Sequence, residues 1–106
     1  MIFAQYKPAA GETAILYTVP AGSAVTGTVY VASQTATQAI DGDFVSIQLV
    51  PDGQTPDNQH SILYGAYKSG GVPIYLQKIY LNEGDKIRIY SDRGHCSFTF
   101  TGQVFS

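Results

Sequence analysis

The chain has no tryptophan, a single cysteine and few charged side chains. One cysteine cannot form an internal disulfide, so the fold does not depend on an oxidising compartment. Charged residues make up only 13% of the chain, and the six basic and eight acidic residues are scattered singly. This excludes the clustered Lys and Arg with which proteins bind nucleic acid or acidic membranes. We therefore expect no nucleic-acid partner.

Long apolar runs are also missing. No segment provides the ~20 apolar residues that a membrane-spanning helix needs. The first residues, MIFAQYKPAAG, have neither the basic leader nor the apolar stretch of a secretory signal. A chain of 106 residues has the length of one domain with one core. We therefore expect a single domain over residues 1–106, with no membrane partner.

What the chain has instead is a regular alternation of apolar and polar residues. The segments VTGTVYVAS (25–33), FVSIQLVP (44–51) and DKIRIYS (85–91) follow period two, which is typical of half-buried antiparallel strands. The residues predicted to face the core are Val25, Gly27, Val29, Val31, Val45, Ile47, Leu49, Ile87 and Ile89. The residues predicted to face outward are Thr26, Thr28, Tyr30, Ser46, Gln48, Val50, Lys86, Arg88 and Tyr90. No segment has the spacing of an amphipathic helix.

Turn-forming residues divide the chain at short intervals, since Gly, Pro, Asp and Asn recur between the alternating segments. They predict eight strands, at residues 2–6, 12–18, 24–33, 43–50, 60–67, 73–80, 86–91 and 95–104. Eight short antiparallel strands in one small domain indicate an all-β antiparallel sandwich that is jelly-roll-like. Residues 1–7 are predicted to form either an edge strand or an N-terminal arm that adds a strand to a neighbour's sheet.

A thiol active site is the first chemical hypothesis, because Asp92, His95 and Cys96 supply a nucleophile and its helpers. Adjacent residues on a strand point to opposite faces of the sheet. Cys96 is therefore predicted to lie in the core beside Phe98 and Phe100, while His95 faces solvent and cannot act as its base. We predict no catalytic residue and no enzymatic activity.

Metal binding has little support in the sequence. Residues 83–85 offer two carboxylates, but these flank a turn glycine before a strand. The acidic candidates for calcium are residues 41–43, Asp52 and Asp57. They lack the dense ligand spacing of a calcium loop, and Asp-Gly is ordinary turn chemistry. His60 and His95 would form a pair only if the fold brought them together, and no third ligand is indicated. We predict no metal and no cofactor.

The eight tyrosines carry more information. Tyr30, Tyr75 and Tyr90 are predicted to share outward faces with Thr and charged residues. Such tyrosines are typical of cross-strand packing, but they also provide contact area with a polar tip at partner-binding surfaces. A third interpretation, an aromatic platform for a glycan, is weakened by the absence of tryptophan.

Four segments together resemble the small β-sandwich structural proteins of tailed bacteriophages. They are AILYTVPAGSAVTGTVYVAS (14–33), VSIQLVPDGQ (45–54), SILYGAY (61–67) and IYLNEGDKIRIYSDRGHCSFTFTGQ (79–103). In that family an LYTVPAG opening precedes an alternating strand, and an LxxGDxIRV turn and strand precede the last strand. The chain departs from the pattern in Gly27, which lies inside a strand, and in a longer loop at residues 34–42. Gly27 predicts a bulge or a close backbone approach.

The resemblance implies a virion component without enzymatic activity. Its position would be on the outer particle, as a capsid decoration or cement protein bound to the major capsid protein, or at the neck, tail or fibre. It would be made in the host cytoplasm and would form a closed homo-oligomer, for which we expect a trimer. No catalytic residues carry over from the family to this chain.

The residues are also compatible with two other functions. One is a carbohydrate-binding or host-receptor-binding module of a phage tail, in which tyrosines and loop carboxylates read a glycan. The other is an enzyme that uses Cys96, which would require an exposed thiol in an electropositive setting.

Overall fold

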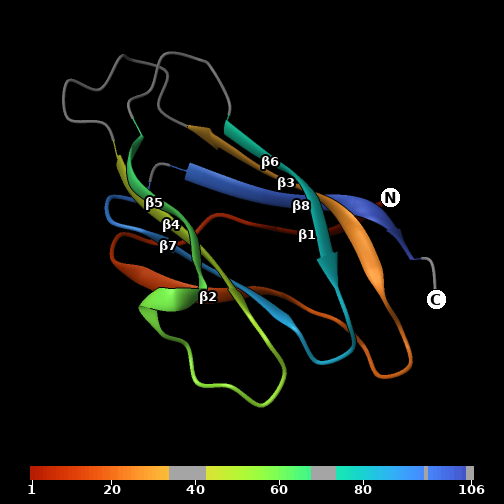
Figure 1. The fold of residues 1–106 in the computed structure, drawn as a ribbon. Coiled ribbons are helices and arrows are strands. Elements are labelled where there is room, and N and C mark those ends of the chain that lie inside the picture. The colour runs from red at the N-terminus through yellow and green to blue at the C-terminus, as the bar shows by residue number, and fades with distance from the viewer. Residues whose placement is uncertain (34–42, 68–73, 95, 105–106) are drawn as a thin grey trace.

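The computed structural model describes residues 1–33, 43–67, 74–94 and 96–104, and these form two antiparallel sheets packed face to face (Figure 1). The strands are β1 (Ile2–Tyr6), β2 (Glu12–Thr18), β3 (Val25–Ser33), β4 (Asp43–Val50), β5 (Ser61–Tyr67), β6 (Ile74–Leu81), β7 (Lys86–Ser91) and β8 (Cys96–Val104), with a 3-10 turn η1 (Asn58–His60) before β5. Each begins and ends within one residue of its predicted range. The predicted all-β sandwich is therefore confirmed.

The strand order is that of a jelly roll. One sheet, sheet A, has the order β1-β8-β3-β6, and the other, sheet B, has the order β2-β7-β4-β5. The first strand thus pairs with the last, the second with the seventh, the third with the sixth and the fourth with the fifth. This nested pairing is that of one long hairpin of eight strands folded over on itself. The β3–β8 pair then completes sheet A, and the β4–β7 pair completes sheet B.

The core consists of the inward faces of the two sheets. Its fully buried members include Val25, Val29, Val31, Val45, Ile47, Ile87, Ile89, Cys96, Phe98 and Phe100. Strand alternation explains this set, because every second residue points to the same face of a strand. The predicted inward faces of the three alternating segments are therefore confirmed at these residues, and the core position of Cys96 with them.

Two residues near one end of β4 lie on its outer face and are nevertheless buried. Gln48 and Val50 were predicted to face outward, yet only 9% of Gln48 and 1% of Val50 is exposed. The segment between β4 and β5 folds back over this end, and Gln48 Nε2 donates a hydrogen bond to the carbonyl oxygen of Asp57 at 3.3 Å. Both residues keep the predicted outward register, since Gln48 pairs with Arg88 and Val50 with Lys86 on β7. The sequence pattern did not show that a loop, rather than solvent, covers this part of the outer face of β4.

Gly27 allows the central strands of sheet A to approach closely. It lies opposite Gly102 in the β3–β8 pair. A Cβ atom on Gly27 would overlap the carbonyl oxygen of Thr101, and a Cβ atom on Gly102 would overlap the carbonyl oxygen of Thr26. The register of β6 against β3 also shifts just after Gly27, where Lys78 has a positive φ of 63°. The close approach and the bulge predicted from Gly27 are thus both present.

The first residues belong to sheet A of their own chain. β1 is an edge strand that pairs with β8, and the Gly102 N–H donates to the Met1 carbonyl oxygen at 2.8 Å. The Phe3 ring lies 5.2 Å from both the Tyr17 ring and the Phe100 ring, measured between centroids. This aromatic cluster joins β1 to β2 across the two sheets and closes that side of the sandwich. The described residues include no helix long and apolar enough to cross a membrane.

Candidate functional site

The structure describes two of the three residues considered for thiol chemistry, Cys96 and Asp92, and these two differ in exposure. Cys96 is completely buried in the core between the two sheets, together with Phe98 and Phe100. Asp92 is exposed on the turn after β7, where its Oδ1 atom accepts a hydrogen bond from the Tyr90 hydroxyl at 2.9 Å. His95 lies outside the described residues. A thiol in this position is shielded from reagents in solution.

The turn carboxylates fasten neighbouring loops to one another. Asp85 accepts backbone N–H groups at both oxygens, from Asp52 at 3.0 Å and from Asn82 at 2.9 Å. Glu83 accepts the N–H of Gly22 at 3.2 Å. These bonds tie the β6–β7 turn to the segments after β2 and β4, so the carboxylates satisfy loop N–H groups. The side chains of residues 41–43 lie outside the described part of the chain.

His60 holds the segment between β4 and β5 in place. It is buried, its Nδ1 atom accepts the Asp57 N–H at 3.1 Å, and its Nε2 atom lies 2.9 Å from Gln54 Oε1. With Nδ1 as acceptor, Nε2 carries the proton and donates to Gln54. Among the described residues no group of three or more His, Cys, Asp or Glu side chains is placed to hold a metal ion.

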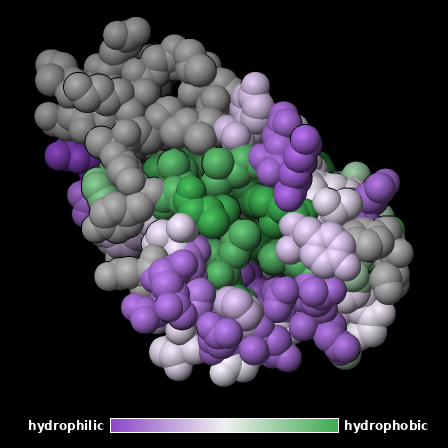
Figure 2. Space-filling model, in the orientation of Figure 1, coloured by the Kyte–Doolittle hydropathy of each residue, from purple (hydrophilic) through white to green (hydrophobic). Residues whose placement is uncertain are grey.

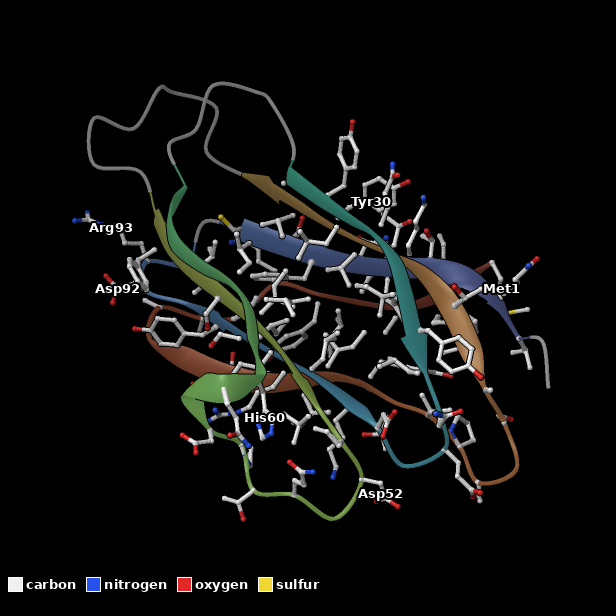
Figure 3. All side chains as sticks on the ribbon, viewed as in Figure 1. Met1, Tyr30, Asp52, His60, Asp92 and Arg93 are labelled. Atoms are coloured by element: carbon white, nitrogen blue, oxygen red, sulfur yellow. The ribbon has the colours of Figure 1, made fainter. Side chains whose placement is uncertain are left out.

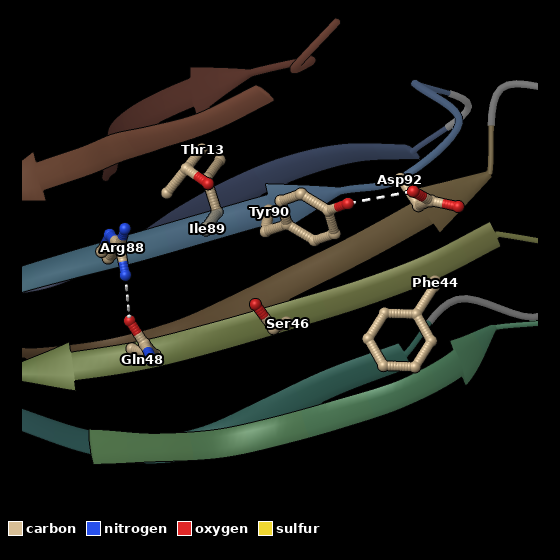
Figure 4. A pocket seen from close by; sticks show the side chains of 8 residues that line it. All are labelled: Thr13, Phe44, Ser46, Gln48, Arg88, Ile89, Tyr90 and Asp92. Carbon is tan, nitrogen blue, oxygen red and sulfur yellow. Dashed lines mark hydrogen bonds between the residues drawn. The ribbon is translucent and has the colours of Figure 1, made fainter. Parts of the chain in front are cut away.

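A hollow of about 450 Å³ lies on the outer face of sheet B (Figure 4), and we call it the outer hollow. Its lining residues are Thr13, Phe44, Ser46, Gln48, Arg88, Ile89, Tyr90 and Asp92. Three strands, β2, β4 and β7, and the turn after β7 supply them. Thr13 on β2 pairs with Tyr90 on β7, which in turn pairs with Ser46 on β4, so these three form one row across the sheet.

The polar groups of the outer hollow are held by hydrogen bonds at its two ends. At one end the Arg88 Nη1 atom donates to Gln48 Oε1 at 2.8 Å. At the other end Tyr90 donates to Asp92, and Figure 4 shows the Tyr90 and Phe44 rings standing near this end. One cation and one anion line the hollow, so its formal charge is zero. The arrangement is a neutral, open depression with hydrogen-bonding groups and aromatic carbon.

The outer face of sheet A has a different character, and we call it the Tyr/Thr face. Its described outward positions include Ile2, Gln5, Thr26, Thr28, Tyr30, Ala32, Tyr75, Gln77, Lys78, Tyr80, Ser97, Thr99, Thr101 and Gln103. Among these, Lys78 is the one charged residue. Tyr30 and Tyr75 lie opposite each other with ring centroids 6.0 Å apart, and 40% and 53% of these residues is exposed.

A third feature is the side of the sandwich between the edge strands β5 and β6, which we call the open side. Figure 2 shows apolar surface between these strands, rimmed by hydrophilic residues. Leu63 on β5 and Leu76 on β6 point inward but are only partly buried. The opposite side differs because β1 and β2 contact each other there. An apolar strip with a polar rim is typical of an interaction surface.

No protein-family model, no curated protein and no solved structure matches this chain. The outer hollow, the Tyr/Thr face and the open side are therefore the features that bear on function. Sequence reasoning placed Arg88 and Tyr90 at outward positions of one strand but did not join them to Ser46 and Thr13. The signal that would have found the outer hollow is the run of polar outward positions on β2, β4 and β7, combined with the order of strands in a jelly roll.

Proposed function

We propose that this protein is a non-enzymatic structural component of a tailed-bacteriophage particle. It stabilises or decorates the particle, as a capsid cement or decoration protein or as a neck, tail or fibre component. It acts by self-association and by contacts with larger virion proteins. The observation that carries the proposal is the apolar strip of the open side, because a chain of this size exposes part of its core there. The resemblance of the four sequence segments supports the phage context.

Self-association through the open side has a direct physical reason. Leu63 and Leu76 belong to the inner faces of the two sheets, yet they remain partly in contact with solvent. Covering apolar surface contributes about 25 cal/mol per Å², so a second copy that packs here gains stability from residues the monomer cannot bury. Closed symmetry then limits the assembly to a defined number of copies, and a trimer is the number we propose.

The contact is one of side chains rather than of paired strand edges. β6 carries a bulge, and Lys78 lies within it with a positive φ. Bulges and lysines on an edge strand hinder pairing with another strand. β1 is already paired with β8 of its own sheet. The Tyr/Thr face, with Lys78 as the one charge among its described positions, is the surface we assign to larger virion proteins, since interfaces are depleted in charge and enriched in Tyr.

Light scattering after size-exclusion chromatography tests the self-association. We expect a trimer for the wild-type chain and a shift toward monomer for Leu76→Glu, because a carboxylate on the strip would be desolvated in the oligomer. Ile15→Glu is the matched control, since Ile15 is 48% exposed on β2, at the far edge of sheet B. It should leave the mass unchanged. Circular dichroism establishes that both variants are folded.

Hydrogen exchange of the wild-type protein provides a second readout that does not depend on any variant. Amide exchange in β5 and β6 should slow as the protein concentration rises and the oligomer forms, while β1 and β2 stay unchanged. A monomer at all concentrations, or protection elsewhere, would contradict the proposed interface. The role in the particle is tested by cryo-electron microscopy of assembled virions, and absence of the chain from the map would refute it.

A further inference from the structure

The outer hollow has the volume of a small-molecule site. Its volume of about 450 Å³ lies within the ~300–1,000 Å³ that is common for ligand pockets. It lies on sheet B, whereas the Tyr/Thr face is on sheet A and the open side lies between the two sheets. A ligand bound here would therefore leave both proposed interaction surfaces uncovered.

Six of the eight lining residues carry hydrogen-bonding side chains. The hydrogen-bonding groups are the hydroxyls of Thr13, Ser46 and Tyr90, the amide of Gln48, the guanidinium of Arg88 and the carboxylate of Asp92. Both donors and acceptors are thus present within one depression. The half-buried rings of Phe44 and Tyr90 add apolar surface at the Asp92 end.

Two of these groups retain hydrogen-bonding capacity. A guanidinium carries five N–H donors, and the hydrogen bond of Arg88 within the described residues is made by Nη1 to Gln48. Asp92 uses Oδ1 for Tyr90, and its Oδ2 atom accepts no hydrogen bond from the described part of the chain. Each is fixed in orientation by the bond it does make. Pre-organised groups of this kind bind with less loss of entropy than mobile ones.

The two charged side chains of the outer hollow, Arg88 and Asp92, limit which ligands can bind there. An anionic ligand, such as a phosphate or a sialic acid, would meet the Asp92 carboxylate, and a cationic ligand would meet the Arg88 guanidinium. A wholly apolar ligand would remove water from the Arg88 guanidinium and from the exposed Asp92 carboxylate, and it would offer no hydrogen bonds in its place. What remains is a neutral molecule with many hydroxyl groups, each of which both donates and accepts.

We propose that the outer hollow binds a neutral hexopyranose, as a free sugar or as a residue of a surface polysaccharide. Adjacent ring hydroxyls match the fork of the Arg88 guanidinium at one end and the Asp92 carboxylate at the other. The C–H face of the pyranose packs on the aromatic carbon of Phe44 and Tyr90. Ser46 and Thr13 lie between these ends and bond the remaining hydroxyls. This site is independent of the proposed structural function.

The test is a titration of the isotope-labelled protein, followed by two-dimensional NMR. The probes are glucose, galactose, mannose and N-acetylglucosamine, with glucuronic acid as the charged comparison. We expect saturable shifts for at least one neutral sugar at residues of β2, β4 and β7 in the hollow. Arg88→Met and Asp92→Ala should each weaken binding about tenfold or more, because a charged hydrogen bond is lost.

The matched control for Arg88→Met is Arg93→Met. Arg93 is exposed on the turn after β7, next to Asp92 (Figure 3), and does not line the outer hollow. It carries the same charge, so a nonspecific electrostatic effect would appear in both variants, whereas the proposed site responds only to Arg88→Met. Absence of saturable shifts at about 50 mM of every neutral sugar, where even a millimolar site is filled, overturns the proposal. Shifts confined to another surface, or tighter binding of glucuronic acid, also overturn it.

Discussion

The Gly27→Ala substitution tests the packing of the central strands of sheet A. The added methyl group would overlap the carbonyl oxygen of Thr101 and would lie 2.9 Å from the carbonyl carbon of the same residue. Both atoms belong to the backbone of β8, which is held between β1 and β3. β8 therefore cannot yield as a flexible side chain would, and the two strands must separate locally.

The magnitude follows from what that separation disturbs. Overpacking of this kind typically costs ~1–3 kcal/mol. Weakening the one or two ladder hydrogen bonds beside Gly27 adds about 0.5–1.5 kcal/mol for each bond. Replacing glycine restricts the unfolded chain and offsets roughly 0.4–1 kcal/mol. We expect a net loss of about 2–3 kcal/mol, which corresponds to a decrease in Tm of roughly 10–20 °C for a domain near this size.

Chemical denaturation at fixed protein concentration measures this loss, since the proposed self-association would make apparent stability depend on concentration. Gly53→Ala is the control. Gly53 has a φ of 78° with no atom near its added Cβ, so the substitution should cost only the ~1–2 kcal/mol of a left-handed alanine. Gly102→Ala should resemble Gly27→Ala, and the double variant should cost less than the sum because the strands separate only once. If Gly27→Ala costs no more than Gly53→Ala, the steric argument is refuted.

Three further predictions concern other parts of the fold. Phe3→Ala should lower the free energy of unfolding by about 2–3 kcal/mol, since it empties an aromatic cluster with Phe100; a negligible loss in denaturation would mean that β1 does not secure this side. Cys96 should react with a thiol reagent only on unfolding, and rapid labelling of the native protein would contradict its burial. The hydrogen bond to Glu12, followed by burial and the Glu12 charge, raises the pKa of Tyr6 above its ordinary value of 10.0. NMR titration of the Tyr6 ring should show this raised pKa, and in Glu12→Gln the pKa should return toward its ordinary value. The stability that the protonated Tyr6 hydroxyl contributes is present below pH 10.0 and is lost as the pH rises through the raised pKa.

The strands could be predicted from the sequence because each has one buried face. In β7 the alternation of Ile87 and Ile89 with Arg88 admits only one orientation, and a shift of one residue would expose both isoleucines. Turn residues such as Gly84, with a φ of 82°, mark where the chain reverses. Local chemistry therefore defines the beginning and end of each strand.

The pairing of the strands is not local, and for this reason the outer hollow was not predicted. Thr13, Ser46 and Tyr90 come together only when β2, β7 and β4 lie side by side. Each residue alone is an ordinary polar outward position. The burial of Gln48 has the same origin, because it depends on a loop that His60 holds against the end of β4. Period two reports which side of a strand faces the core, but not what covers the other side.

The outer hollow, the Tyr/Thr face and the open side are separate surfaces. The structural proposal and the sugar-binding proposal can therefore be tested independently. Arg88→Met should weaken sugar binding about tenfold or more while the proposed oligomer keeps its mass, because Arg88 lies on the outer face of sheet B and not on the open side. Leu76→Glu should do the reverse, since a monomer retains an intact hollow. If both proposals hold, the two activities combine on a polysaccharide surface, where the proposed trimer would engage several sugars and gain ~10²–10⁴ in avidity over one site. Leu76→Glu should therefore lose retention on immobilised polysaccharide while its affinity for the free monosaccharide stays unchanged. Equal loss of both would mean that the open side and the outer hollow are one site.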